Sequence, residues 1–101
     1  ISGGENIHPA EIEHIALADP AVAEAAVVGL PDARWGEVPV LVVVARPGVA
    51  VDTARLEAAF DAGLARYKHP KRIVVMPELP KTALGKVARA ALSTMLAKCD
   101  A

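Results

Sequence analysis

Two apolar runs that lie close together, residues 22–30 and 38–45, constrain most strongly how this chain can fold. Both are rich in valine, whose branched side chain packs well on a pleated surface and favours extended backbone. Pro31 follows the first run and Pro47 follows the second, so turn residues bound both of them. Short apolar runs with such boundaries predict two strands.

Three other segments have apolar residues at helical spacing. The first predicted helix begins near Pro9, where a missing N–H costs nothing, and ends before Pro20. The second follows Asp52, a good N-cap, and breaks at residues 68–70. The third covers residues 87–97. Their expected inward residues are Ile12, Ile15 and Ala16; Leu56, Ala59, Phe60, Gly63 and Leu64; and Val87, Ala91, Leu92, Met95 and Leu96.

A short third strand is expected at residues 73–76, followed by a loop over residues 77–85 that contains two prolines and a glycine. The element order is therefore helix, two strands, helix, strand, helix. This order predicts an α+β fold in which a small β-sheet of about three main strands has about three helices packed on it. The 101 residues are enough for one domain, residues 1–101, with a modest core.

The net charge of the chain is small, but its charged residues are unevenly distributed along the sequence. The formal net charge of -1 argues against a dedicated nucleic-acid binder. Residues 1–37 hold seven acidic side chains and one base, whereas residues 66–89 hold seven lysines and arginines and one acid. The basic segment suits a small polyanion such as a nucleotide, and a solvated surface is the alternative interpretation.

The single cysteine, Cys99, cannot form an internal disulfide, which favours a reducing compartment and a cytoplasmic location. No signal peptide and no apolar run of membrane-spanning length are found in the sequence. The first residue is Ile1 and a glycine pair follows at once, so we expect the sequence to be part of a longer protein.

Familiar site motifs are incomplete. Gly85-Lys86 does not finish a phosphate-binding P-loop, because Pro80 stands where that motif needs glycine and Val87 where it needs serine or threonine. The three histidines and the cysteine lack the spacing of a metal site, so none is predicted. Lys81 and Lys86 flank a loop with a glycine, from which a lysine can reach an anion as a mobile point charge; the alternative is an exposed surface lysine.

Four motifs in order resemble those of the C-terminal domain of the acyl-adenylate-forming (AMP-binding) superfamily. They are the opening I-S-G-G-E-N-I-H-P-A-E-I-E at residues 1–13, G-L-P-D with R-W-G-E at residues 29–37, Y-K-H-P-K at residues 67–71, and L-P-K-T-A-L-G-K-V at residues 79–87. The resemblance covers essentially the whole chain and is closest in look to bacterial fatty-acid and aryl-acid CoA ligases.

The resemblance implies a two-step reaction. A carboxylic acid attacks the α-phosphate of Mg-ATP to give acyl-AMP and pyrophosphate, and the thiol of CoA then displaces AMP. It also implies that the protein's own N-terminal domain holds most of the ATP and acyl sites together with Mg²⁺, and that the C-terminal domain rotates between the steps. The isolated domain is therefore expected to be inactive.

The resemblance also implies roles for particular residues. Lys86 matches the lysine that bridges the carboxylate and the α-phosphate during adenylation. The residues that match the channel for the pantetheine arm of CoA are Gly3, Gly4, Glu5 and Trp35. The residues that match the segment meeting the CoA nucleotide are Tyr67, Lys68, His69 and Lys71.

Two alternatives are an adenylation domain that loads a carrier protein and a binding module without catalysis. In the first, the basic segment at residues 67–71 would face a protein. A soluble CoA molecule brings its own phosphates, so the basic segment favours an acyl-CoA synthetase.

Overall fold

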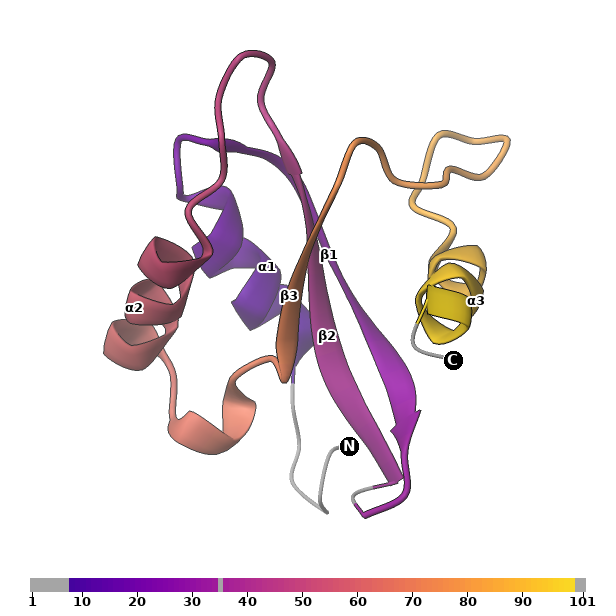
Figure 1. Cartoon of the computed structure of the whole chain (residues 1–101), viewed down its shortest axis with the longest axis horizontal. Helices are drawn as coiled ribbons and strands as arrows, with labels where there is room; N and C mark the ends of the chain where they lie inside the picture. Colours follow the sequence, from indigo (N-terminus) through magenta and orange to yellow (C-terminus); the bar gives the residue numbers. More distant parts are fainter. Residues whose placement is uncertain (1–7, 35, 100–101) are drawn as a thin grey trace.

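The computed structural model describes residues 8–34 and 36–99. One sheet lies between two helical layers, with α1 and α2 on one face and α3 on the other (Figure 1). This arrangement confirms the predicted α+β class with its three helices and three strands. The elements are α1 (Pro9–Leu17), β1 (Val22–Asp32), β2 (Gly36–Ala45), α2 (Thr53–Gly63), a 3₁₀ turn (Arg66–Lys68), β3 (Arg72–Met76) and α3 (Arg89–Cys99).

The sheet has the strand order β1-β2-β3, so the most apolar strand is central. β1 and β2 form an antiparallel hairpin in which Val27 lies opposite Leu41, and β3 joins β2 in parallel with Ile73 beside Leu41. Every residue from 38 to 44 is buried, because β2 has helices on both faces and a strand on both sides. That position explains why the second apolar run has no polar residue.

Alternate residues of the strands form two separate cores, one on each face of the sheet. The core under α3 contains Ala26, Val28, Leu30, Val40, Val42, Val44, Leu79, Leu92 and Leu96. The core under α1 and α2 contains Ile12, Ala16, Val22, Val27, Leu41, Val43, Leu56 and Phe60. Of the predicted inward residues of the first two helices, Ile12, Ala16, Leu56 and Phe60 are buried, whereas Gly63, the last residue of its helix, is exposed.

The third helix differs from its prediction. It begins at Arg89, because Val87 pairs with Lys81 in an isolated antiparallel bridge and is therefore extended. Leu92 and Leu96 are buried as expected, but Ala91 and Met95 are exposed. α3 is the only described helix on its face of the sheet, so only a narrow i, i+4 stripe is covered.

The second helix also ends earlier than predicted, at Gly63, and the chain continues through the 3₁₀ turn (Arg66–Lys68) before β3. Its beginning is as predicted. The Asp52 carboxylate accepts hydrogen bonds from the backbone N–H groups of Ala54 and Arg55, at 3.0 and 3.3 Å. A carboxylate in this place satisfies donors that the helix itself leaves unpaired.

The outer edge of β1 is closed at Val27 by two side chains from opposite layers. Glu13 of α1 accepts the Val27 N–H at 2.7 Å, and Arg89 of α3 donates to the Val27 carbonyl at 2.6 Å. The two side chains also form an ion pair at 3.0 Å, and the Glu13 side chain is only 17% exposed. We call Glu13, Val27 and Arg89 the β1 edge clamp; it joins α1 to α3 around the side of the sheet.

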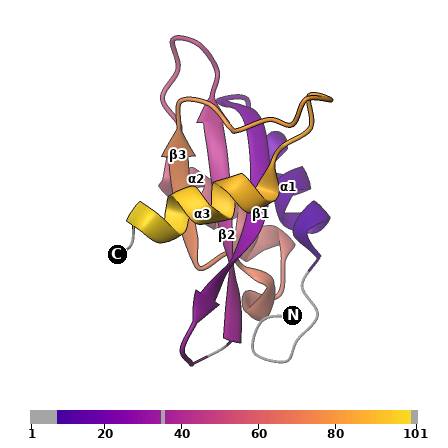
Figure 2. The same ribbon diagram turned by 90° about the vertical axis from the view of Figure 1, so that its right-hand side faces the viewer.

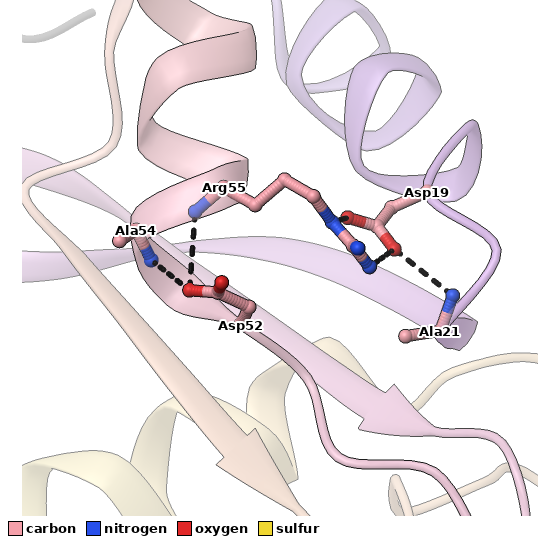
Figure 3. Close-up of polar contacts among 5 residues, drawn as sticks. All are labelled: Asp19, Ala21, Asp52, Ala54 and Arg55. Carbon is pink, nitrogen blue, oxygen red and sulfur yellow. Dashed lines mark hydrogen bonds and ion pairs between the residues drawn. The ribbon is translucent and has the colours of Figure 1, made fainter.

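A second polar contact fixes the turn between α1 and β1 to α2 (Figure 3). The Asp19 carboxylate accepts two hydrogen bonds from the Arg55 guanidinium, at 2.8 and 2.6 Å, and one from the Ala21 N–H at 2.9 Å. The hydrogen bond from Arg55, followed by that from Ala21, lowers the pKa of Asp19 below its ordinary value of 3.8. The charged form of Asp19 is therefore the one that the fold stabilises.

The β1 edge clamp predicts a stability effect at Glu13. Glu13→Ala leaves the Val27 N–H without its acceptor and removes the ion-pair partner of Arg89, which we expect to lower the free energy of unfolding by about 1–3 kcal/mol. Urea denaturation followed by circular dichroism measures this loss. Glu57→Ala on the exposed side of α2 is the matched control, with an expected change within about 0.5 kcal/mol. Equal losses in the two variants would contradict the clamp.

The Asp19–Arg55 contact predicts a pH-dependent effect. Because the native-state pKa of Asp19 is lowered, its contribution is full above the unfolded-state pKa and disappears as the pH falls through the lower native-state value. Asp19→Asn should therefore be less stable than the parent near pH 7, and the difference should shrink below about pH 4. Urea midpoints from pH 2 to pH 7 test this, and a difference that did not change with pH would refute it.

Candidate functional site

The predicted lysine, Lys86, lies at the end of a tight hairpin turn. The Thr82 N–H donates to the Lys86 carbonyl at 2.7 Å, and the Gly85 N–H donates to the Thr82 carbonyl at 2.9 Å. Residues 83–85 thus form a three-residue hairpin loop, whose last position usually needs a left-handed backbone. Gly85 has a φ of 84°, which glycine adopts without steric cost. Lys86 therefore leaves the turn from a defined backbone position.

The two lysines that flank this turn have different surroundings. The Lys81 ammonium lies 2.7 Å from a carboxylate oxygen of Glu24, at the start of β1. Lys86 is exposed, and within residues 8–34 and 36–99 its ammonium has no hydrogen bond or ion pair. Of this pair, only Lys86 presents a cation that no carboxylate of the described chain neutralises.

The segment predicted to meet the CoA nucleotide begins in the 3₁₀ turn. Tyr67 is 53% exposed, so one large aromatic side chain is open to solvent. The Lys68 ammonium lies 5.9 Å from the centre of the Tyr67 ring and 3.4 Å from a carboxylate oxygen of Glu11. The Lys71 N–H donates to the Pro39 carbonyl at 2.8 Å, which joins the end of the segment to β2.

His69, in the same segment, points inward. Its Nε2 lies 3.1 Å from the Leu64 carbonyl oxygen, which can only accept, so Nε2 carries a proton. Its Nδ1 lies 3.6 Å from the Asp61 carboxylate, and its ring centre lies 6.3 Å from that of Phe60. The imidazole thus holds the segment to the end of α2.

Four other predicted site residues, Gly3, Gly4, Glu5 and Trp35, lie outside the described residues. The nearest described residue after the first three is His8, which precedes α1, and the residues on either side of Trp35, Arg34 and Gly36, are described. The side chain of Cys99, the last residue of α3, is also outside the described part.

The described neighbours of the predicted CoA contacts lie at one end of the molecule, and Lys86 lies toward the other. In Figures 1 and 2 the 3₁₀ turn, the start of α1 and the β1–β2 turn share one end, whereas the turn before α3 lies at the opposite end. The contacts agree, since Lys71 bonds to Pro39 while Lys81 pairs with Glu24, which lies opposite Val44. Pro39 and Val44 are about 17 Å apart along β2 at 3.3 Å per residue.

Some partners of these residues could not be found from sequence. Glu24 lies outside the four motifs and Glu11 lies inside the first of them, but the lysine that each contacts lies far along the chain. Thr82 lies inside the motif at residues 79–87, but the sequence around it does not indicate that its side chain accepts a hydrogen bond.

An apolar groove of about 680 Å³ lies between β3 and α3, and Val75 and Met95 are among its lining residues. No cluster of three His, Cys, Asp or Glu side chains suited to a metal ion occurs among the described residues. None of the described helices has the length and apolar character needed to cross a membrane.

Comparison with known proteins gives one consistent result. The family described as AMP-binding enzyme C-terminal domain matches residues 11–86. Indoleacetate–CoA ligase of Aromatoleum aromaticum is 49% identical over 98 residues, which are 97% of this chain and 19% of that protein. 4-Chlorobenzoate–CoA ligase of a Pseudomonas species is 51% identical over 90 residues, 88% of this chain and 17% of that protein.

The solved structures agree with these sequences. Mycobacterium tuberculosis fatty acyl CoA synthetase superimposes with a TM-score of 0.89 at 38% identity, over 98% of this chain and 20% of that one. The chain thus spans about a fifth of the length of the proteins that it matches.

Proposed function

Since this chain belongs to the family of AMP-binding enzyme C-terminal domains, we propose that it is the C-terminal domain of an AMP-forming acyl-CoA synthetase. Such an enzyme converts a carboxylic acid, ATP and CoA into acyl-CoA, AMP and pyrophosphate. The observation that carries the proposal is the exposed ammonium of Lys86, which has no carboxylate partner among the described residues, on its hydrogen-bonded turn.

Adenylation needs such a cation. A carboxylate must approach an α-phosphate that is also negative, and a positive charge between them offsets the repulsion. Lys86 supplies that charge, whereas the Lys81 ammonium is already paired with Glu24. The family resemblance implies that Mg²⁺ is held by ATP and the N-terminal domain rather than by this chain.

The opposite end of the domain serves thioester formation. The exposed Tyr67 ring offers a face for adenine, and Lys68 and Lys71 offer cations for phosphates. Gly3, Gly4, Glu5 and Trp35 line the path of the pantetheine arm, where glycines let a narrow chain pass close to the backbone. His69 belongs to the same segment and contacts Leu64.

The distance between these two ends supports a domain that turns between the steps. One orientation against an N-terminal domain brings Lys86 to the acyl and ATP sites, and another brings Tyr67 and its neighbours to the same place. The relatives are about five times longer than this chain, which leaves room for such a partner domain. The reducing cytoplasm suits an enzyme with a single cysteine in this domain.

We expect Lys86 to matter for adenylation and hardly at all for thioester formation. In the full-length enzyme, Lys86→Ala should lower the rate of acyl-AMP formation from carboxylate and ATP by about a hundred- to a thousandfold, the usual cost of one preorganised charge. The same variant should stay near the wild-type rate with pre-made acyl-AMP and CoA.

Lys81→Ala is the control for this pair of assays, because it removes an equal charge from the same turn. Its ion pair with Glu24 is about 38% exposed on both sides, so its loss should be mild in both half-reactions. If Lys86→Ala lowered the rates of both half-reactions equally, the proposal that opposite ends of the domain serve the two steps would be wrong. If Lys81→Ala were the worse variant in adenylation, the assignment of the lysine would be wrong.

The CoA end gives a separate prediction. The double variant Lys68→Ala/Lys71→Ala should raise the KM for CoA modestly, since exposed charge contacts contribute roughly 0.2–1 kcal/mol each. The rise should shrink at high salt, and the KM for ATP should not change. Lys81→Ala, at the other end, should leave the KM for CoA unchanged. An unchanged KM for CoA in the double variant would favour a carrier protein as the acyl acceptor.

A further inference from the structure

The turn that carries Lys86 is closed by a single side chain, that of Thr82. Besides its two backbone hydrogen bonds across the turn, Thr82 accepts the Lys86 N–H on its hydroxyl oxygen Oγ1 at 3.3 Å. Both the N–H and the carbonyl of Lys86 are therefore bonded to Thr82. The backbone of the proposed adenylation lysine is held on both sides by one residue.

The hydroxyl supplies an acceptor beyond those of the backbone. In this three-residue loop the Thr82 carbonyl accepts the Gly85 N–H, and the next donor, the Lys86 N–H, bonds to the Thr82 side chain. A hydroxyl oxygen on Cβ can accept such a hydrogen bond locally, whereas an apolar side chain cannot. Valine keeps the branched shape of threonine and removes only this acceptor.

The chain segments before and after the turn both contact the rest of the domain. On one side Lys81 pairs with Glu24, and on the other Arg89 belongs to the β1 edge clamp. The Ala88 N–H also donates to the Pro80 carbonyl at 2.8 Å, between the two segments. Between these contacts lie residues 82–86, and the hydrogen bonds across this part of the turn are those of Thr82.

We propose that Thr82 is a positioning residue for adenylation, whose hydroxyl fixes the backbone of Lys86 and so the path of its ammonium. This inference rests on the proposed role of Lys86. A lysine side chain is long and flexible, so a fixed starting point reduces the positions that the charge can sample. Small displacements of a group that must meet a transition state cost much of its effect.

The test compares three forms of the full-length enzyme in separate half-reactions. Thr82→Val should lower the maximal rate of acyl-AMP formation roughly three- to tenfold, the range expected for one lost hydrogen bond, with little change in the KM for ATP. Thr82→Ser, which keeps the hydroxyl, should restore the rate to within about twofold of wild type. Both variants should form thioester from pre-made acyl-AMP at the wild-type rate.

A double-variant cycle decides whether Thr82 acts through Lys86. In a Lys86→Ala background, Thr82→Val should cause no further loss of adenylation, because there is no ammonium left to position. A full additional loss in that background would overturn the proposal, as would a wild-type rate for Thr82→Val alone. Equal loss of both half-reactions in Thr82→Val would also overturn it, since the hydroxyl would then serve the fold.

The same measurements separate this inference from the proposed function. If Lys86→Ala adenylates normally, the proposed function fails, and the role of Thr82 fails with it. If Lys86→Ala is crippled while Thr82→Val is unaffected, only the role of Thr82 fails.

Discussion

At Val27 the outer edge of the sheet meets Glu13 from one helical layer and Arg89 from the other, and much of the structure depends on this contact. An edge strand exposes backbone donors and acceptors that would otherwise remain open to water or to another chain. Here the N–H and the carbonyl of one residue are both bonded, and the two side chains neutralise each other. Because Arg89 is the first residue of α3, the clamp also fixes the end of the turn that carries Lys86.

The same kind of pairing organises the charges of the whole domain. The acidic first third of the chain and the basic last third lie against each other, through Glu11 with Lys68, Glu13 with Arg89 and Glu24 with Lys81. The two shorter pairs, at 2.7 and 3.0 Å, use Lys81 and Arg89, which composition alone would assign to a polyanion site. Lys86 belongs to none of these pairs, and the proposed catalytic charge has no carboxylate partner in the described chain. Tyr67 and the end of its segment offer a second surface, at the opposite end of β2.

The fold was largely predictable because its signals are local. Valine-rich runs gave both long strands, and Asp52 marked the start of α2 where its carboxylate indeed caps the helix. The errors lie at places where a distant or cross-turn contact overrides local preference. Val87 has an apolar side chain at helical spacing, yet its bridge to Lys81 keeps it extended and delays α3 to Arg89. Met95 lies between the buried Leu92 and Leu96 along α3 but is exposed, because only the narrow stripe of those two leucines faces the sheet.

The site shows the same division. Motif spacing within short stretches was enough to propose Lys86 and the segment that begins at Tyr67, and it was enough to place the chain in its family. Spacing could not tell which cations remain free, because their partners lie far away in the chain: 57 residues separate Lys68 from Glu11, and 76 separate Arg89 from Glu13. Motif spacing also could not show that Tyr67 and Lys86 belong to two separate surfaces, since the first precedes β3 and the second follows it, and they lie within twenty residues of each other. Folding decides these matters, because only the packed sheet brings one set of charges together and holds the turn before α3 and the 3₁₀ turn before β3 toward opposite ends of the molecule.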